Sequence, residues 1–90
     1  MATMIVPRSL ASWLGGCTEA ACVGRTVGEC VQELEESFPG FRERVIDETG
    51  QIRATVLFFL NGDSVRDRGG VDAPVGEGDE MSVVPLAAGG

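Results

Sequence analysis

The chain has 90 residues, 14 acidic against 7 basic side chains, a net charge of −7, and a hydrophobic fraction of 43%. This length and composition are typical of one small globular domain, and the acidic balance argues against nucleic-acid binding, which needs a basic face. The sequence contains no histidine and no lysine, which excludes histidine-dependent nucleophiles, Schiff-base chemistry and a Walker A phosphate loop.

The first quarter of the chain predicts two strands separated by a short helix. Residues 3–6 are a β-prone run that Pro7 ends. Residues 9–14 place their large apolar side chains at helical spacing, which predicts one or two turns of amphipathic helix. Residues 19–23 predict a second strand.

The clearest predicted element is a helix that begins at Thr26. Thr26 and Glu29 have the spacing of a capping box, in which each side chain binds a free amide at the helix start. Pro39-Gly40 ends the helix. One apolar stripe at helical spacing is expected to face the core: Val27, Cys30, Val31, Leu34 and Phe38.

The same helix has an acidic face, formed by Glu29, Glu33 and Glu36 with Gln32 and Glu35 beside it. We interpret it as a solvated face, and a patch that meets arginine on a partner is the alternative.

The region after the helix predicts a second short helical piece at 41–46 and then a hairpin. Residues 55–60 are β-branched and aromatic with apolar side chains on both faces, which predicts a central strand. Asn61-Gly62 follows at once and is typical of a tight hairpin turn, with 63–66 as the short return strand.

These elements predict an α+β fold in two layers, because one main helix can cover only one face of a four- or five-stranded sheet. Residues 67–80 are expected to be loop, and residues 81–84 to form the last strand, which Pro85 ends. A compact arrangement places the first and last strands parallel and side by side at the centre of the sheet.

The three cysteines do not form a recognisable metal site. The spacing of Cys17 and Cys22 matches the first two ligands of a plant-type iron–sulfur loop, but the next position of that loop is Arg25. Three thiolates without histidine are one ligand short of a structural zinc site. We therefore predict no metal and place Cys22 and Cys30 in the core, with reactive or metal-binding roles as the alternative; Cys17 has no assigned function.

The predicted compartment is the cytoplasm. No apolar stretch approaches the ~20 residues that span a bilayer. Residues 14–17 look like the end of a lipoprotein signal, but residues 7–9 interrupt the apolar run that a signal peptide requires. We therefore expect no membrane partner.

The last five residues, 86–90, are the segment where chemistry is expected. Nothing in their sequence predicts an anchor to the core, and fully extended they reach ~17 Å. Gly89 and Gly90 lack Cβ atoms, so the backbone can enter a narrow channel of a partner. A carboxylate delivered in this way can attack the α-phosphate of ATP; a frayed terminus is the alternative. We divide the chain into a domain at 1–85 and a flexible tail at 86–90.

The whole pattern resembles the MoaD/ThiS family of ubiquitin-like sulfur carrier proteins. The residues that carry the resemblance are the 26–38 helix, the 56–60 strand running into Asn61-Gly62, and Gly76 to Pro85 followed by Gly89-Gly90. The long 61–75 segment is most similar to the CysO-like branch. The resemblance implies a β-grasp fold with a mixed sheet of four to five strands and the main helix packed on one face.

The resemblance implies a protein co-substrate and not an enzyme. An E1-like activating enzyme of the MoeB/ThiF type, using ATP and Mg²⁺, would adenylate the Gly90 carboxylate. A sulfur donor would convert the adenylate to a thiocarboxylate, and a downstream synthase would accept the sulfide to make cysteine or another sulfur metabolite. The chain itself would bind no cofactor. The small subunit of molybdopterin synthase and a ubiquitin-like modifier conjugated through Gly90 are the alternatives.

The resemblance also implies apolar partner contacts on the open sheet face and around the tail. By alternation Met81 and Val83 should face the helix and leave Val84 outward. Leu57 and Phe59 share one face of their strand, and we place that face on the open side, with a core position as the alternative. The candidate partner-binding residues are therefore Val84, Pro85, Leu86, Leu57 and Phe59.

Overall fold

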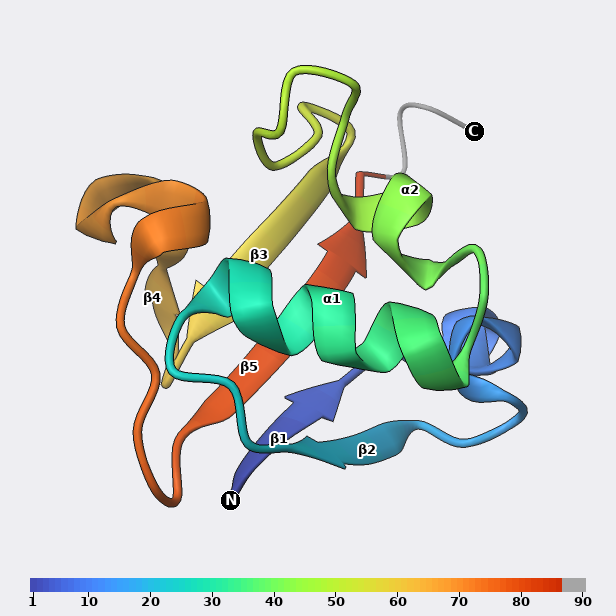
Figure 1. Ribbon diagram of the computed structural model, residues 1–90. Helices are drawn as coiled ribbons and strands as arrows, with labels where there is room; N and C mark the ends of the chain where they lie inside the picture. The colour runs from blue at the N-terminus through green and yellow to red at the C-terminus, as the bar shows by residue number, and fades with distance from the viewer. Residues whose placement is uncertain (87–90) are drawn as a thin grey trace.

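A computed structural model describes residues 1–86 and arranges them as a sheet with helices packed on one face (Figure 1). The strand order is β2-β1-β5-β3-β4; β1 and β5 are parallel at the centre, and the other neighbours are antiparallel. The predicted α+β, β-grasp architecture and the parallel central pair are confirmed. The strands are β1 Ala2–Ile5, β2 Glu19–Cys22, β3 Val56–Leu60, β4 Asp63–Ser64 and β5 Glu80–Pro85.

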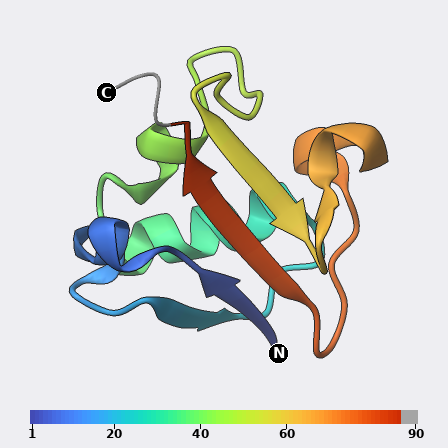
Figure 2. The ribbon, with the colours of Figure 1, turned by 180° about the vertical axis from the view of Figure 1, so that it is seen from behind.

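The helices cover one face of this sheet. Seen from behind, β5 and β3 lie in front and α1 lies beyond them (Figure 2). The face turned toward the viewer in Figure 2 is called the open face below. The helical segments are the 3₁₀ turn η1 Arg8–Leu14, the helices α1 Val27–Ser37 and α2 Phe41–Val45, and the 3₁₀ turns η2 Val65–Arg68 and η3 Gly70–Asp72.

The start of α1 differs in one detail from the predicted capping box. Thr26 Oγ1 accepts a hydrogen bond from the Glu29 amide at 3.1 Å, as predicted. The Glu29 carboxylate accepts from the Arg25 amide at 2.9 Å, one residue before the position that a capping box uses. The predicted apolar stripe is confirmed, because Val27, Cys30, Val31 and Leu34 are buried and Phe38 packs against the core.

Two acidic side chains of α1 bind backbone amides of the segments that precede and follow the helix. The Glu33 carboxylate accepts hydrogen bonds from the amides of Val23 and Gly24 at 2.9 and 3.0 Å. The Glu35 carboxylate accepts from the amides of Arg42 and Gly40, and these bonds lower the pKa of Glu35. Neither the solvated-face nor the partner-patch interpretation anticipates this role.

The hairpin after β3 forms as predicted, but its return strand is shorter. Asn61 and Gly62 both have positive φ, 53° and 89°, the pattern of a tight type I′ turn. β4 contains two residues, because Val65 turns into the core and begins η2. The Arg66 guanidinium takes the place of a longer strand by donating to the carbonyls of Arg53 and Val56, at 2.7 and 3.3 Å. Strand β3 is therefore flanked on both sides only at its C-terminal end.

The 67–80 segment, predicted as loop, contains the end of η2 and all of η3, and it is tied to the rest of the fold. The Val27 amide donates to the Ala73 carbonyl at 3.0 Å. Asp79 accepts from the Gly76 amide at 2.8 Å and from the Asn61 side-chain amide at 3.0 Å. The side-chain oxygen Oδ1 of Asn61 accepts a hydrogen bond from the Glu80 amide at 2.9 Å, so this turn fixes where β5 begins.

Candidate functional site

The open face carries four of the five apolar side chains that were predicted to contact partners, and the exception is Pro85, which shares the face of the buried Val83 and Val56. Met81 and Val83 are fully buried beneath the helix layer, and Val84 between them and the tail is 39% exposed. Leu57 is 37% exposed and Phe59 is half-buried, whereas their strand neighbours are buried on the helix side. Both the alternation in β5 and the open-face placement of Leu57 and Phe59 are confirmed.

Strand register brings these residues together. Leu57 lies directly opposite Val84, and Phe59 lies opposite Ser82. Ser82 is also the partner of Ile5 on β1, so Ile5 joins the same row. The sequence analysis missed Ile5, because its neighbours Met4 and Val6 are also apolar and only the structure shows that they are buried while Ile5 is not. We call Leu57, Phe59, Val84, Ile5 and Leu86 the open-face patch.

The base of the C-terminal tail is held in the sheet by one further hydrogen bond. The Leu86 amide donates to the Thr55 carbonyl at 3.0 Å, which extends the β3–β5 ladder past Pro85. Leu86 is 41% exposed, and alternation along this extended ladder places it on the same face as Val84. Gly89 and Gly90 lie outside the described residues, so their role stays a prediction. The division of the chain into a domain at 1–85 and a flexible tail at 86–90 also stays a prediction.

Pro85 is compatible with this ladder because its missing amide is not needed there. It lies opposite Val56, and its nitrogen points to the side of β1. Strand β1 ends at Ile5, opposite Ser82, so no strand continues beside Pro85. Pro85 is half-buried, between the buried Val83 and the exposed Leu86.

Two arginines lie at the end of the sheet from which the tail leaves. Because Val56 pairs with Pro85, the start of β3 and the end of β5 are at the same end. Arg66 binds two carbonyls there, and Arg53 donates from Nε to the Glu43 carbonyl at 2.5 Å. These guanidinium groups place positive charge at the same end of the sheet as the tail base, in a protein with a net charge of −7. No sequence pattern singled them out.

The buried thiols do not have the properties of nucleophiles. Cys22 and Cys30 are in the core, as predicted, and donate to the carbonyls of Ala2 and Gly24 at 3.8 and 3.5 Å. Burial raises the pKa of Cys22 and raises that of Cys30 to about 12, so both are protonated near neutral pH. Cys17 is exposed. Within residues 1–86, no group of cysteine and carboxylate side chains is placed to hold a metal ion.

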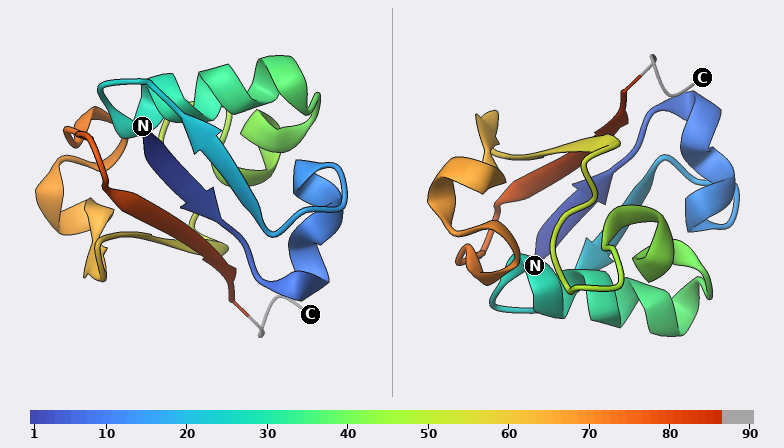
Figure 3. Two further views of the ribbon diagram at one scale, coloured as in Figure 1. Left: turned by 90° about the horizontal axis from the view of Figure 1, so that it is seen from below. Right: turned by 90° about the horizontal axis from the view of Figure 1, so that it is seen from above.

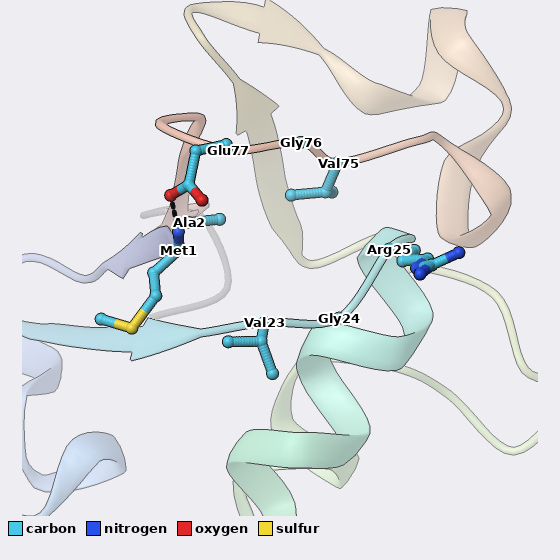
Figure 4. Close-up of a pocket in the computed structure, with 8 residues that line it drawn as sticks. All are labelled: Met1, Ala2, Val23, Gly24, Arg25, Val75, Gly76 and Glu77. Atoms are coloured by element: carbon cyan, nitrogen blue, oxygen red, sulfur yellow. Dashed lines mark ion pairs between the residues drawn. The ribbon is translucent and has the colours of Figure 1, made fainter.

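A cavity of about 460 Å³ lies at the other end of the sheet, around the N-terminus (Figure 4). Its walls come from the start of β1, the 23–25 turn and the 75–77 segment, and Glu77 pairs with the amino group of Met1. Because β1 and β5 are parallel, this cavity is at the opposite end from the tail base. It is therefore not part of the tail site.

Across residues 1–86, no helix has both the length and the apolar character to span a bilayer.

Comparisons with known proteins agree with this architecture. Residues 6–90 match the family model described as the ThiS family. The sulfur carrier protein CysO of Mycobacterium tuberculosis is 30% identical over 90 residues, which cover 98% of this chain and 97% of that protein. The small archaeal modifier protein 3 of Haloferax volcanii is 34% identical over 65 residues, 72% of this chain and 70% of that protein.

Among solved structures, a chain of the Amycolatopsis orientalis BexX/CysO complex superposes with a TM-score of 0.92. It is 29% identical, and the match covers 100% of both chains. The similarity therefore extends over the sheet, the helix layer and the segment that leads into the tail.

Proposed function

Because the chain belongs to the ThiS family, we propose that it is a sulfur carrier of the CysO kind, a protein substrate that other enzymes load and unload. The observation that carries this proposal is the full-length similarity to CysO, together with the Gly89-Gly90 end of the sequence. The modifier protein from Haloferax volcanii matches over a smaller part of the chain. The full-length match favours the carrier over the modifier.

The proposed chemistry takes place at the Gly90 carboxylate. An E1-like enzyme of the MoeB/ThiF type binds ATP and Mg²⁺; a carboxylate oxygen of Gly90 attacks the α-phosphorus and pyrophosphate leaves. A sulfur donor, as sulfide or a persulfide, then attacks the acyl carbon of the adenylate and expels AMP. With a persulfide donor, a thiol reductant cleaves the resulting acyl disulfide. The product is a thiocarboxylate, from which a sulfur-accepting synthase takes the sulfide.

The described residues support this proposal by presenting the tail next to an apolar surface. The ladder bond between Leu86 and Thr55 fixes the point from which the tail extends. The four residues beyond Leu86 span at most ~14 Å, enough for the terminal carboxylate to enter a partner's cleft. The open-face patch next to this point offers exposed apolar side chains, which are typical of a protein contact site.

A ubiquitin-like modifier would use the same activation step and differ in the acceptor, which would be a lysine amine of another protein. Higher-mass adducts of this chain in its own cells would favour the modifier, and a thiocarboxylate without adducts favours the carrier. Stable copurification with one larger subunit would instead favour the small subunit of a synthase.

The proposal is tested with purified chain, an E1-like enzyme from the same cell, ATP and Mg²⁺. We expect ATP–pyrophosphate exchange that depends on the chain. After addition of a sulfur donor and a thiol reductant, intact mass spectrometry should show one oxygen replaced by one sulfur. The absence of exchange with every E1-like enzyme of that cell would contradict the proposal.

A further inference from the structure

An aromatic pocket lies in the helix layer, away from the open-face patch. The chain has one tryptophan, four phenylalanines and no tyrosine. Three of these five aromatic residues, Trp13, Phe38 and Phe41, line a single cavity of about 310 Å³. Figures 1 and 3 show that η1 lies beside the C-terminal end of α1. The residues that line the cavity come from η1, the end of α1 and α2 and the segments next to them. More than half of the aromatic residues of this chain therefore line one cavity.

The pocket has one cationic group above its aromatic wall. The guanidinium carbon of Arg44 lies 5.5 Å from the centre of the Trp13 ring, a cation–π geometry. Arg44 is exposed, and among residues 1–86 no carboxylate forms an ion pair with it. The ring face therefore orients the guanidinium, and because its N–H donors have no acceptor within the described part of the chain, they can bind an anion.

The shape of the pocket depends on a close approach at Gly15, which ends η1. Gly15 has φ +67°, and a Cβ at this position would lie 3.0 Å from Cε1 of Phe38. The absence of a side chain lets η1 come against the Phe38 ring. The hydroxyl residues Ser12 and Ser37 line the same cavity and are exposed.

We propose that this Trp13–Arg44 pocket is a docking site for a segment of a partner protein that presents an apolar side chain beside a carboxylate. Tryptophan and arginine are the residues that most often dominate binding at protein interfaces. The apolar side chain fills the space between Trp13 and Phe38, and the carboxylate binds the free guanidinium of Arg44. The positive charge of Arg44, the charged side chain that lines this pocket, favours a ligand with a carboxylate over a neutral or cationic one.

This inference goes beyond the carrier function and does not depend on it. The open-face patch and the tail base belong to the sheet, whereas this pocket belongs to η1, α1 and α2. Docking here needs neither ATP nor an activated tail. A failure to bind would therefore leave the carrier proposal intact, and a failure of adenylation would leave this proposal intact.

Trp13 is the sole tryptophan, so its fluorescence reports directly on the pocket. The probe is the blocked tripeptide Glu-Leu-Glu, added to the full chain. We expect a saturable change in Trp13 emission with a dissociation constant near ~1 mM, the range of a weak contact. The blocked tripeptides Lys-Leu-Lys and Glu-Gly-Glu should bind at least several-fold more weakly. An equal response to the three peptides, or no saturation, would overturn the proposal.

Matched variants separate the pocket from net charge. Arg44→Gln should weaken binding of the acidic peptide by roughly tenfold, the effect of losing one hydrogen-bonded charged partner. Arg42→Gln is the control, because Arg42 is an exposed arginine of the same helix that does not line this cavity. It should leave the affinity unchanged within about twofold. Equal weakening by both variants would show that only overall charge matters and would refute the site.

Discussion

Two neighbouring valines of β5 provide a matched test of the open-face patch. Val83 is 0% exposed beneath the helix layer, and Val84 is 39% exposed on the open face. Val83→Arg puts an unpaired charge into the core at a cost of several kcal/mol, comparable with the 5–15 kcal/mol that stabilises a typical domain, so we expect unfolding. Val84→Arg should change the unfolding free energy by no more than about 0.5 kcal/mol, because arginine at this position reaches solvent.

The magnitude for partner binding follows from the exposed fraction of Val84. Complete burial of a valine side chain contributes about 1.5–3 kcal/mol. The 39% that is still exposed in the free protein is the part that a partner can bury, which gives about 0.6–1.2 kcal/mol. Loss of that contribution weakens binding by about three- to sevenfold. The arginine must also lose water at an apolar contact, so we expect a total weakening of at least about tenfold.

Urea denaturation measures the two unfolding free energies, and calorimetric titration with the E1-like enzyme measures the affinity of Val84→Arg. Leu57→Arg, on the residue opposite Val84, should weaken the same binding by a similar factor. If Val84→Arg unfolds the protein, the strand faces are misassigned. If Val84→Arg folds and binds like the parent, the open-face patch is not the contact surface.

The remaining predictions concern the core, the turn before β5 and the thiols. Leu34→Asp should abolish the cooperative thermal transition seen by circular dichroism, because it buries an unpaired charge; a native-like melt would refute the core-facing stripe of α1. Hydrogen bonds from the Gly76 amide and, to a smaller extent, from the Asn61 side chain lower the pKa of Asp79. The ionised Asp79 therefore stabilises the folded protein fully above about pH 4, and this contribution is lost as the pH falls through the lower pKa of the folded state. Asp79→Asn should therefore reduce the urea midpoint at neutral pH, and the midpoint of the variant should fall less than that of the parent as the pH is lowered below about 4. An equal fall in parent and variant would contradict this. In native protein a maleimide should label Cys17 alone, with Cys22 and Cys30 labelled only after denaturation, and rapid labelling of all three would contradict their burial.

Local sequence patterns were sufficient for most of the fold. A helix or strand with one buried face repeats its apolar residues with the period of that element. This is why the apolar stripe predicted the buried face of α1, and why the alternation in β5 predicted that Met81 and Val83 are buried and Val84 is not. Asn61-Gly62 predicted its turn because few residue pairs adopt two successive positive φ angles.

Features that depend on contacts distant in sequence were not accessible in this way. Strand β4 ends after two residues because Val65 turns into the core, and Arg66 then binds the carbonyls of Arg53 and Val56, contacts with no local signature. The faces of Leu57 and Phe59 stayed open to two interpretations because every residue of β3 is apolar, so its pattern has no alternation to read.

The candidate site was predicted in part. Its apolar members on β3 and β5 were identified, whereas Ile5 reaches the patch only through the parallel pairing of β1 with β5. The bond from Leu86 to Thr55 was missed because a hydrogen bond between backbone groups 31 residues apart leaves no trace in side-chain composition.

The most direct test of the carrier proposal is the position of the terminal carboxylate. One alanine added after Gly90 moves the carboxylate by ~3.5 Å, beyond near-attack distance from an α-phosphate, and deletion of Gly90 withdraws it by the same amount. Both variants should have the melting temperature of the parent, and both should lose ATP–pyrophosphate exchange with the activating enzyme, whereas the parent gains one sulfur in place of one oxygen by intact mass. If the extended protein, with no protease present to trim it, becomes a thiocarboxylate at the rate of the parent, the proposal that Gly90 acts through its free carboxylate is wrong.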